Sequence, residues 1–349
     1  MKTKYLLIGT LPPPKGGQAA ITKFVRQIHD FDLIIDTTKR SFYFFTDFLV
    51  FLVKSFKYRF THTHIYTAIS RGKFSVLREL LLIVVINPNR CVNHLHGNDF
   101  EWIFSTKVYA KLIRHLYKKH VSLTICVNKY QCDFLDKWNI KNVLLPNPIV
   151  DAYDKNYIAC SNINFNVERN YTFGYISFVM SSKGVFTVLE EFKKLLLDRP
   201  LSKLLIAGEI KGDDELDFKS TYDKFYLTLN LLNKTNPECV KYIGHVDGIK
   251  KIKFYTSIKY LLFLSRFKSE SFGLVLIEAM DLGAMPVIND NPILKDTLKT
   301  FTYEELSISN SMSKLYDSNI EYRKLKQNSD IVKSIYYPEN FKNKILTYL

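Results

Sequence analysis

Cysteine is scarce in this 349-residue sequence, and the cysteines present form no recognisable pattern. Their number is odd, no two of them make a Cys-x-x-Cys pair, and they are scattered along the chain as Cys91, Cys126, Cys132, Cys160 and Cys239. Such a pattern provides neither a disulfide framework nor a thiolate metal site, and it favours a reducing cytoplasm. The cysteines therefore predict no metal site.

Long hydrophobic runs are also missing. No stretch of about 18 apolar residues is free of charge, so the sequence predicts no transmembrane helix. The apolar run Tyr5–Leu11 is too short for a signal peptide and is interrupted by three prolines from Pro12 onward, so it is interpreted as a buried first strand. We expect a cytoplasmic protein.

Motifs that bind nucleic acid are absent, although the chain is strongly basic. The formal net charge is +15 and the sequence pI is about 9.3. This excess implies an anionic partner, which can be nucleic acid, an anionic membrane face or a phosphorylated substrate. Because there is no helix-turn-helix, zinc finger or aromatic RNP-like strand, we expect no nucleic-acid partner. A non-catalytic basic binding protein remains an alternative.

What the sequence does contain is a regular alternation of short apolar runs and longer helical patterns, which is typical of α/β proteins with parallel sheets. The length exceeds one typical domain. The predicted strands are Tyr5–Gly9, Leu33–Asp36, His64–Ala68, Arg90–Leu95, Leu123–Val127, Val143–Pro146, Tyr171–Tyr175, Lys203–Ala207, Val240–Ile243 and Tyr260–Leu264. The predicted helices are Ala19–His29, Phe42–Phe60, Lys73–Ile86, Phe104–Lys118, Tyr130–Trp138, Gly184–Asp198, Asp214–Asn230 and Lys250–Ser257.

Two glutamates frame the start of a further predicted helix, in the segment Glu270-Ser271-Phe272-Gly273-Leu274-Val275-Leu276-Ile277-Glu278. A helix that starts after Gly273 leaves Glu270 on the preceding loop and places Glu278 more than one turn inside. Both carboxylates can then face one crevice. The free N–H groups of the helix start suit a phosphate, and the carboxylates can accept hydrogen bonds from ribose and sugar hydroxyls. The alternative is an amphipathic helix with two solvated glutamates.

Three other polar segments follow predicted strands. Pro12-Pro13-Pro14-Lys15-Gly16-Gly17 precedes a helix and lets the backbone approach a ligand, unless it is a plain turn. It matches neither the dinucleotide nor the nucleoside-triphosphatase fingerprint. His94-Leu95-His96-Gly97 ends a strand with both histidines on one side, and the following Gly-Asn-Asp favours a site for His96. Ser181-Ser182-Lys183-Gly184 opens a helix from which Lys183 can reach a diphosphate.

Taken together, these segments resemble glycosyltransferase family 4 (glycosyl transferases group 1), whose members are retaining GT-B enzymes. The Glu270–Glu278 segment resembles the E-x7-E motif, and its continuation Asp281–Ile288 matches the family's usual run. The resemblance implies an α/β GT-B fold, in which two Rossmann-like domains face each other across a cleft. It implies an acceptor domain at 1–150, a linker at 151–169, a nucleotide-sugar domain at 170–330, and a helix within 331–349 that returns to the first domain.

The resemblance also implies roles for single residues. Glu270, His96 and Lys183 are the catalytic candidates: Glu270 and His96 would bind the sugar, and Lys183 would neutralise the departing diphosphate. Glu278 would hold the ribose. The candidates for donor binding are Gly16, Gly17, Lys183, Arg266, Phe272, Gly273, Leu274, Val275, Glu278 and His245.

One position departs from the family pattern. An arginine commonly stands five residues before the lysine, where this chain has Phe178. Arg266 is our candidate for the missing charge.

The segment 39–60 is aromatic and carries basic residues at both ends. It is interpreted either as an interfacial helix on anionic lipid or as a core helix of the first domain, and the two are compatible.

The sequence therefore predicts a retaining, metal-independent glycosyltransferase without a cofactor. Its substrates would be a nucleotide-diphosphate sugar and a saccharide or lipid-linked acceptor, and its pathway bacterial surface-polysaccharide synthesis. A GT-B nucleotide-sugar epimerase is the second alternative.

Overall fold

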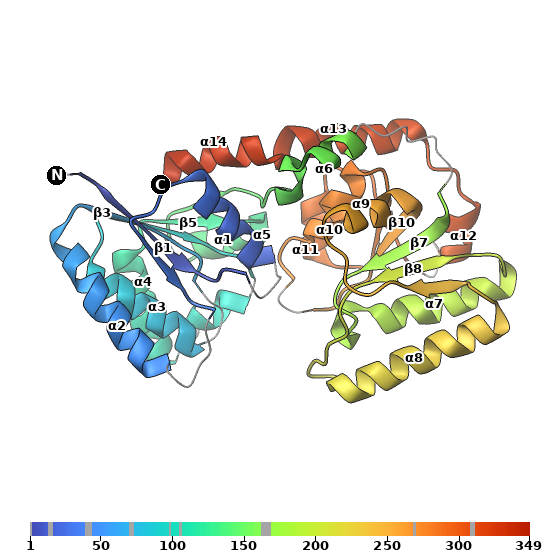
Figure 1. Ribbon diagram of the computed structural model, residues 1–349, viewed down its shortest axis with the longest axis horizontal. Helices are drawn as coiled ribbons and strands as arrows, with labels where there is room; N and C mark the ends of the chain where they lie inside the picture. The colour runs from blue at the N-terminus through green and yellow to red at the C-terminus, as the bar shows by residue number, and fades with distance from the viewer. Residues whose placement is uncertain are drawn as a thin grey trace. The chain divides into compact units, whose positions relative to one another are not determined.

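The computed structural model describes residues 2–12, 17–38, 44–69, 73–97, 99–104, 107–161, 169–267, 270–307 and 311–349. The chain divides into two compact units (Figure 1). Unit 1 comprises Met1–Val150 and Pro338–Leu349, and unit 2 comprises Asp151–Tyr337. Each unit is built on a six-stranded sheet whose strands are all parallel.

The sheet of unit 1 has the strand order β2-β1-β3-β4-β5-β6. Its strands are β1 (Lys4–Gly9), β2 (Leu33–Asp36), β3 (Thr63–Thr67), β4 (Arg90–His94), β5 (Leu123–Cys126) and β6 (Asn142–Leu144). The helices of this unit are α1 (Gly17–Ile28), α2 (Phe44–Phe56), α3 (Lys73–Ile86), α4 (Val108–His120), α5 (Lys129–Asp136) and α14 (Pro338–Tyr348), and two 3₁₀ turns cover Lys57–Phe60 and Asp99–Phe104.

The sheet of unit 1 is buried on both faces, and β1 shows how its sequence achieves this. Leu6 and Ile8 point into one hydrophobic cluster, together with side chains of α3 and α4. Leu7, between them, points into a second cluster with side chains of α1 and with Phe341 of α14. Successive strand residues face opposite sides, so a continuous apolar run is what a covered parallel strand requires. Helix α14 thus completes one face of this sheet.

The sheet of unit 2 has the order β12-β11-β10-β7-β8-β9. Its strands are β7 (Tyr171–Ile176), β8 (Leu204–Ala207), β9 (Val240–Tyr242), β10 (Ile258–Phe263), β11 (Met285–Ile288) and β12 (Glu304–Glu305). Its helices are α6 (Lys155–Ser161), α7 (Val185–Asp198), α8 (Phe218–Thr235), α9 (Gly248–Ser257), α10 (Leu274–Asp281), α11 (Pro292–Leu298), α12 (Met312–Asp317) and α13 (Tyr322–Tyr336), with 3₁₀ turns at Val150–Tyr153 and Ser181–Lys183.

The strand order reverses at β7. From β7 the chain builds the sheet outward through β8 and β9, and then returns to the other side of β7 with β10. The loops that leave β7 and β10 therefore diverge at the carboxyl edge of the sheet. In open α/β sheets such a switch point opens a crevice where ligands bind.

Most predicted elements are confirmed, and β2 and α3 have the predicted bounds. The predicted helix Asp214–Asn230 is wrong at both ends, because α8 runs over Phe218–Thr235. The side chain of Asp217 caps it by accepting from the backbone N–H of Ser220. The carboxylate of Asp213 instead accepts from the N–H groups of Glu215 and Leu216, which holds residues 213–216 in a loop.

Two further predictions need correction. The predicted helix Phe104–Lys118 begins only at Val108 and is preceded by the 3₁₀ turn Asp99–Phe104. The segment 151–169 was predicted to be a linker, but it contains α6, whose Tyr157 is buried. One buried aromatic side chain in a polar segment creates no periodic signal that sequence reading can detect. Within the described residues, no helix has both the length and the apolar character needed to cross a membrane.

Candidate functional site

The candidate site of unit 2 is formed by the loops that follow β10, β7 and β8. These three strands are neighbours in the parallel sheet, so their carboxyl ends lie along one edge. The loop after β7 carries Lys183, and the loop after β10 carries Glu270. The fold thus brings together Lys183 and Glu270, which are 87 positions apart in the sequence.

An ion pair between Lys183 and Glu270 is the central contact of this edge. The Lys183 Nζ atom lies 2.6 Å from Glu270 Oε2, and each side chain is only 12% exposed. The ammonium also lies 4.3 Å from the ring centroid of Phe267, and the Ser265 hydroxyl donates to the same carboxylate oxygen at 3.3 Å. A cation that is shielded from water in this way interacts strongly with anions. Lys183 is therefore suited to bind a phosphate group.

Gly184 permits the close approach of the two loops. Its φ is +83°, and a Cβ atom there would lie 2.1 Å from the carbonyl oxygen of Leu264. The glycine C-caps the 3₁₀ turn and directly precedes α7. Any other residue would combine an unfavourable backbone conformation with a collision against backbone.

The loop after β8 closes the edge with two carboxylates. Asp213 accepts a hydrogen bond from the backbone N–H of Ser182 at 2.7 Å. Burial raises the pKa of Asp213, but hydrogen bonds from Ser182 and from the loop backbone outweigh burial and lower it. Glu215 accepts from the Ser181 hydroxyl at 2.6 Å and from Arg266 at 3.3 Å. The Arg266 side chain is 58% exposed, so this guanidinium stands at the rim of the site.

Phe178, which takes the place of the family's arginine, is in contact with a cation from another loop. The Nζ atom of Lys211 lies 3.8 Å from the centroid of the Phe178 ring. Lys211 also pairs with Glu209 at 3.3 Å. Sequence reasoning missed Lys211, because cation–π contacts between loops leave no spacing signal along the chain.

Glu278 has a separate set of partners. Helix α10 begins after Gly273, as predicted, and Glu278 lies in it with its side chain 3% exposed. Lys251 Nζ lies 2.5 Å from one carboxylate oxygen, and the Tyr255 hydroxyl donates to the other at 2.7 Å. Lys251 also contacts Asp151 at 3.1 Å. Sequence reasoning missed both α9 residues, although their spacing of four places them on one helix face.

The pKa values in this cluster reflect burial and charge. Burial raises the pKa of Glu278, the attraction of Lys251 lowers it, and the net effect is an increase. Burial alone would lower the pKa of Lys251, but the charges of Glu278 and Asp151 outweigh it and raise the pKa. Lys251 is therefore a charged ammonium at neutral pH.

The chain was compared with known families and structures. The sequence model of the family "Glycosyl transferases group 1" matches residues 161–330. Residues 161–330 are therefore similar to a glycosyl transferases group 1 domain.

The capsular polysaccharide biosynthesis glycosyltransferase CapM of Staphylococcus aureus is 30% identical over 122 residues. That match covers 35% of this chain and 28% of CapM, so it spans little more than a quarter of the relative's length.

Solved structures establish the fold over nearly the whole chain. HepE of Anabaena, solved with UDP and glucose, superposes with a TM-score of 0.68 at 12% identity and covers 99% of this chain and 98% of HepE. Sucrose-phosphate synthase of Thermosynechococcus elongatus gives a TM-score of 0.67 at 15% identity, with 99% and 98% covered. A glycosyltransferase of Rickettsia africae gives 0.68 at 14% identity, with the same coverage. The fold is that of the GT-B glycosyltransferases.

Within residues 161–330, the other predicted donor-binding residues lie in different settings. The Phe272 side chain is buried against Tyr336, with ring centroids 5.7 Å apart, so it faces the core rather than a ligand. Gly273 has a φ of +66° and precedes Leu274 and Val275, which form the first turn of α10. His245 is 46% exposed and lies 3.7 Å from the Asp247 carboxylate.

The histidine segment belongs to unit 1. His94 is fully buried, its Nδ1 atom lies 2.9 Å from the Tyr66 hydroxyl, and its ring centroid lies 4.1 Å from that of His96. Burial, assisted by His96, holds the pKa of His94 well below its usual value, so its ring is neutral. β4 ends at His94, so His96 lies two residues beyond the strand, with its ring against that of His94. Gly17 starts α1, and Gly16 lies outside the described residues.

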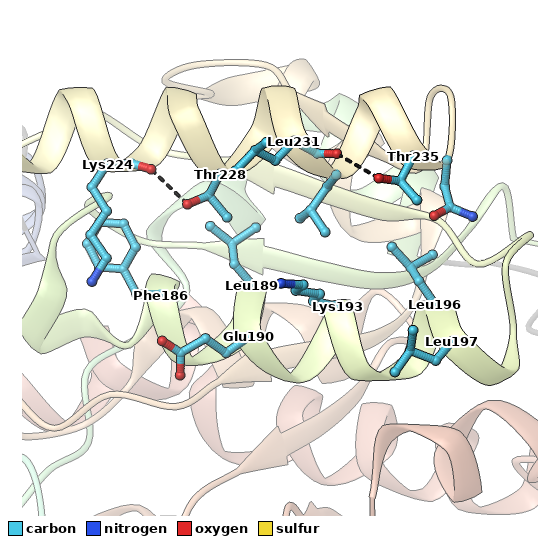
Figure 2. Close-up of a pocket in the computed structure, with 12 residues that line it drawn as sticks. Phe186, Leu189, Glu190, Lys193, Leu196, Leu197, Lys224, Thr228, Leu231 and Thr235 are labelled. Carbon is cyan, nitrogen blue, oxygen red and sulfur yellow. Dashed lines mark hydrogen bonds between the residues drawn. The ribbon is translucent and has the colours of Figure 1, made fainter.

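A groove elsewhere in unit 2 differs in character from this site. It has a volume of about 640 Å³ and lies between α7 and α8 (Figure 2). The hydroxyls of Thr228 and Thr235 donate to backbone carbonyls of α8, which leaves a mostly apolar lining. None of the candidate residues above lines it. Among the described residues, no three His, Cys, Asp or Glu side chains are grouped as a metal would require.

Replacing Gly184 with alanine is expected to destabilise unit 2 by about 2–4 kcal/mol, from the overpacking and the left-handed backbone together. Chemical denaturation measures this free energy of unfolding. Gly244→Ala is the matched control, because Gly244 also has a positive φ of +68° but no heavy atom would lie within 4 Å of its Cβ. Equal losses in the two variants would show that Gly184 is not needed for the loop contact.

Proposed function

We propose that the protein is a retaining glycosyltransferase that moves a sugar from a nucleotide-diphosphate donor to a hydroxyl of a saccharide or lipid-linked glycan. The observation that carries the proposal is the shielded Lys183–Glu270 pair at the switch point of a glycosyl transferases group 1 domain. It offers a cation for the diphosphate beside a carboxylate for sugar hydroxyls. The relation to CapM supports a role in the synthesis of bacterial surface polysaccharide.

The proposed chemistry needs no metal and no cofactor, because the chain supplies the positive charge. Lys183 and the start of α10 would stabilise the negative charge that develops on the leaving diphosphate. The Glu270 carboxylate would orient the sugar, and Glu278 would accept hydrogen bonds from the ribose. His96 is also proposed to bind the sugar. The neutral ring of His94 adds no charge that would repel a glycosyl cation.

Binding of a panel of nucleotide sugars tests the proposal. With UDP-, GDP-, ADP- and dTDP-sugars, the true donor at a hundred times its dissociation constant should stabilise the protein by about 2.7 kcal/mol. Glu278→Gln should weaken donor binding by roughly tenfold, the loss of one charged hydrogen bond. Glu270→Gln should mainly lower kcat. Thermal shift, titration calorimetry and a transfer assay measure the three effects.

Glu190→Gln on α7 is the control, because Glu190 is exposed and lies in the separate groove. Unchanged kinetics in both the Glu270 and Glu278 variants would contradict the site assignment. Turnover of the nucleotide sugar without any acceptor would favour the epimerase instead.

Lys183 and Arg266 are expected to contribute unequally. Lys183→Met should abolish most activity, because the buried Glu270 then repels the diphosphate. Arg266→Met should reduce activity less, since this side chain is 58% exposed and already pairs with Glu215. If both cations act on one diphosphate, their effects will not be additive in a double-mutant cycle. If Arg266→Met keeps wild-type activity, Arg266 does not supply the charge that is missing at the position of Phe178.

We also propose that unit 1 binds anionic membrane through α2 and the 3₁₀ turn that follows it. Ser55 and Tyr58 face the core, whereas Val53 is 76% and Phe60 69% exposed. Lys54 lies beside them and is also exposed. An apolar stripe with flanking lysines is the pattern of an interfacial helix. The first part of the predicted membrane-binding segment, residues 39–43, lies outside the described residues. The side chains of Phe44, Phe45 and Phe48 also lie outside them.

Lys54→Glu with Lys57→Glu should weaken binding to anionic vesicles at least thirtyfold, at about 1 kcal/mol per basic residue. Arg59 is left unchanged, because it donates to the carbonyls of Val84 and Val85 at the end of α3. Co-sedimentation at low and high salt gives the measurement. The control reverses Lys342 and Lys344 on α14, which covers the other face of the sheet. Equal binding by both double variants would show that α2 is only a core helix.

A further inference from the structure

Glu278 is the most deeply buried carboxylate of the candidate site, and it faces one ammonium group. Its side chain is 3% exposed, and that of Lys251 is 21% exposed. The Lys251 Nζ atom lies 2.5 Å from Glu278 Oε1 and 3.1 Å from Asp151 Oδ2. Lys251 therefore links the carboxylate in α10 to Asp151 in the 3₁₀ turn at the start of unit 2.

The other titratable groups around Glu278 cannot replace this cation. Tyr255 of α9 donates to Oε2, and burial raises the pKa of this tyrosine far above neutrality, so it stays an uncharged phenol. Tyr157 of α6 is buried and neutral for the same reason. Asp151 is a second anion. Asp281 lies almost one turn further along α10 and accepts from Ser329 and Tyr337 of the C-terminal part of unit 2.

We propose that Lys251 is a positioning residue of the donor site. It keeps Glu278 in the carboxylate form and fixes the orientation of this side chain. Glu278 can then bind the two vicinal ribose hydroxyls of a nucleoside diphosphate. This inference rests on the proposed function. A carboxylate offers about four acceptor directions. Lys251 and Tyr255 occupy one on each oxygen, so one on each oxygen is left for a vicinal diol. A protonated carboxyl would lose one of these acceptors.

Charge balance is the physical reason for the assignment. Without Lys251, burial and the neighbouring Asp151 would both raise the pKa of Glu278, and the hydrogen bond from Tyr255 would be the remaining influence that lowers it. In a variant without Lys251, Glu278 would therefore be protonated at pH values at which it is ionised in the wild type. A buried ion pair is also a weak source of stability compared with apolar side chains of the same volume. The position of the Lys251–Glu278 pair next to the proposed ligand is better explained by its effect on Glu278, which it holds in the ionised form.

The test compares nucleotide affinity across pH in wild type, Lys251→Met, Lys251→Arg and Glu278→Gln. The probe is whichever of UDP, GDP and ADP binds the wild type most tightly, and calorimetry is done between about pH 6 and pH 9. The quantity used is the ratio of each variant's Kd to that of the wild type. The ionisation of the phosphates is common to all variants and cancels in this ratio.

Lys251→Met should weaken binding about tenfold to a hundredfold near pH 6 and progressively less as pH rises, because deprotonation restores the acceptor. Lys251→Arg should retain most of the affinity. In the Glu278→Gln background, Lys251→Met should cause little further loss, since the group through which it acts is gone. Lys253→Met is the matched control, being an exposed lysine on the same helix. Thermal melting without nucleotide verifies that each variant is folded.

The outcomes separate the inference from the function on which it rests. Binding of none of the three nucleotides by the wild type would overturn the inference, and the absence of stabilisation by dTDP-sugars as well would overturn the function. Tight wild-type binding with an unaltered Lys251→Met variant would overturn only the inference. So would full additivity of the Lys251 and Glu278 losses, because the lysine would then act independently of the carboxylate.

Discussion

The pairing of β7 with both β8 and β10 is the constraint on which the candidate site depends. Because the chain leaves β7 on one side and returns on the other, loops that are far apart in sequence end at one sheet edge. Their contact is then limited by backbone volume at Gly184, where a Cβ would meet the Leu264 carbonyl. Only after this approach can Lys183 reach Glu270. The chemistry of the site thus follows from topology first and from side chains second.

Two lysines are placed against two glutamates, and each pair is largely shielded from water. Buried pairs of this kind gain Coulomb energy but lose hydration, so their net contribution to stability is small. Losing one member is a different matter, because it leaves an uncompensated buried charge. Such pairs therefore fix the charge state and orientation of their members more than they stabilise the fold. For a site that is proposed to bind a diphosphate and a ribose, charge state and orientation are what matter.

Local sequence signals predicted the sheets well, because each parallel strand is a short apolar run with a clear end. The start of α10 was also predictable, since Gly273 marks it and Glu270 precedes it. The failures came from competing local caps and from interactions between distant segments. Asp213 and Asp217 are four residues apart, and only the structure shows that the second one caps α8. The Lys251–Glu278 pair spans 27 positions, and no periodicity links them. The partner of Arg266, Glu215, lies on another loop for which no motif was known.

The two ion pairs also differ in how firmly the fold holds them. Lys183 and Glu270 both lie outside regular helices, on loops joined at Gly184, and loops rearrange more easily than packed helices. Lys251 and Glu278 lie within α9 and α10, where the helix backbones fix their starting points. A phosphate bound as proposed would compete with Glu270 for Lys183, because both anions attract the same ammonium. Glu278 cannot exchange its partner without moving a helix. The first pair is therefore suited to respond to a ligand, and the second to present an unchanged carboxylate to it.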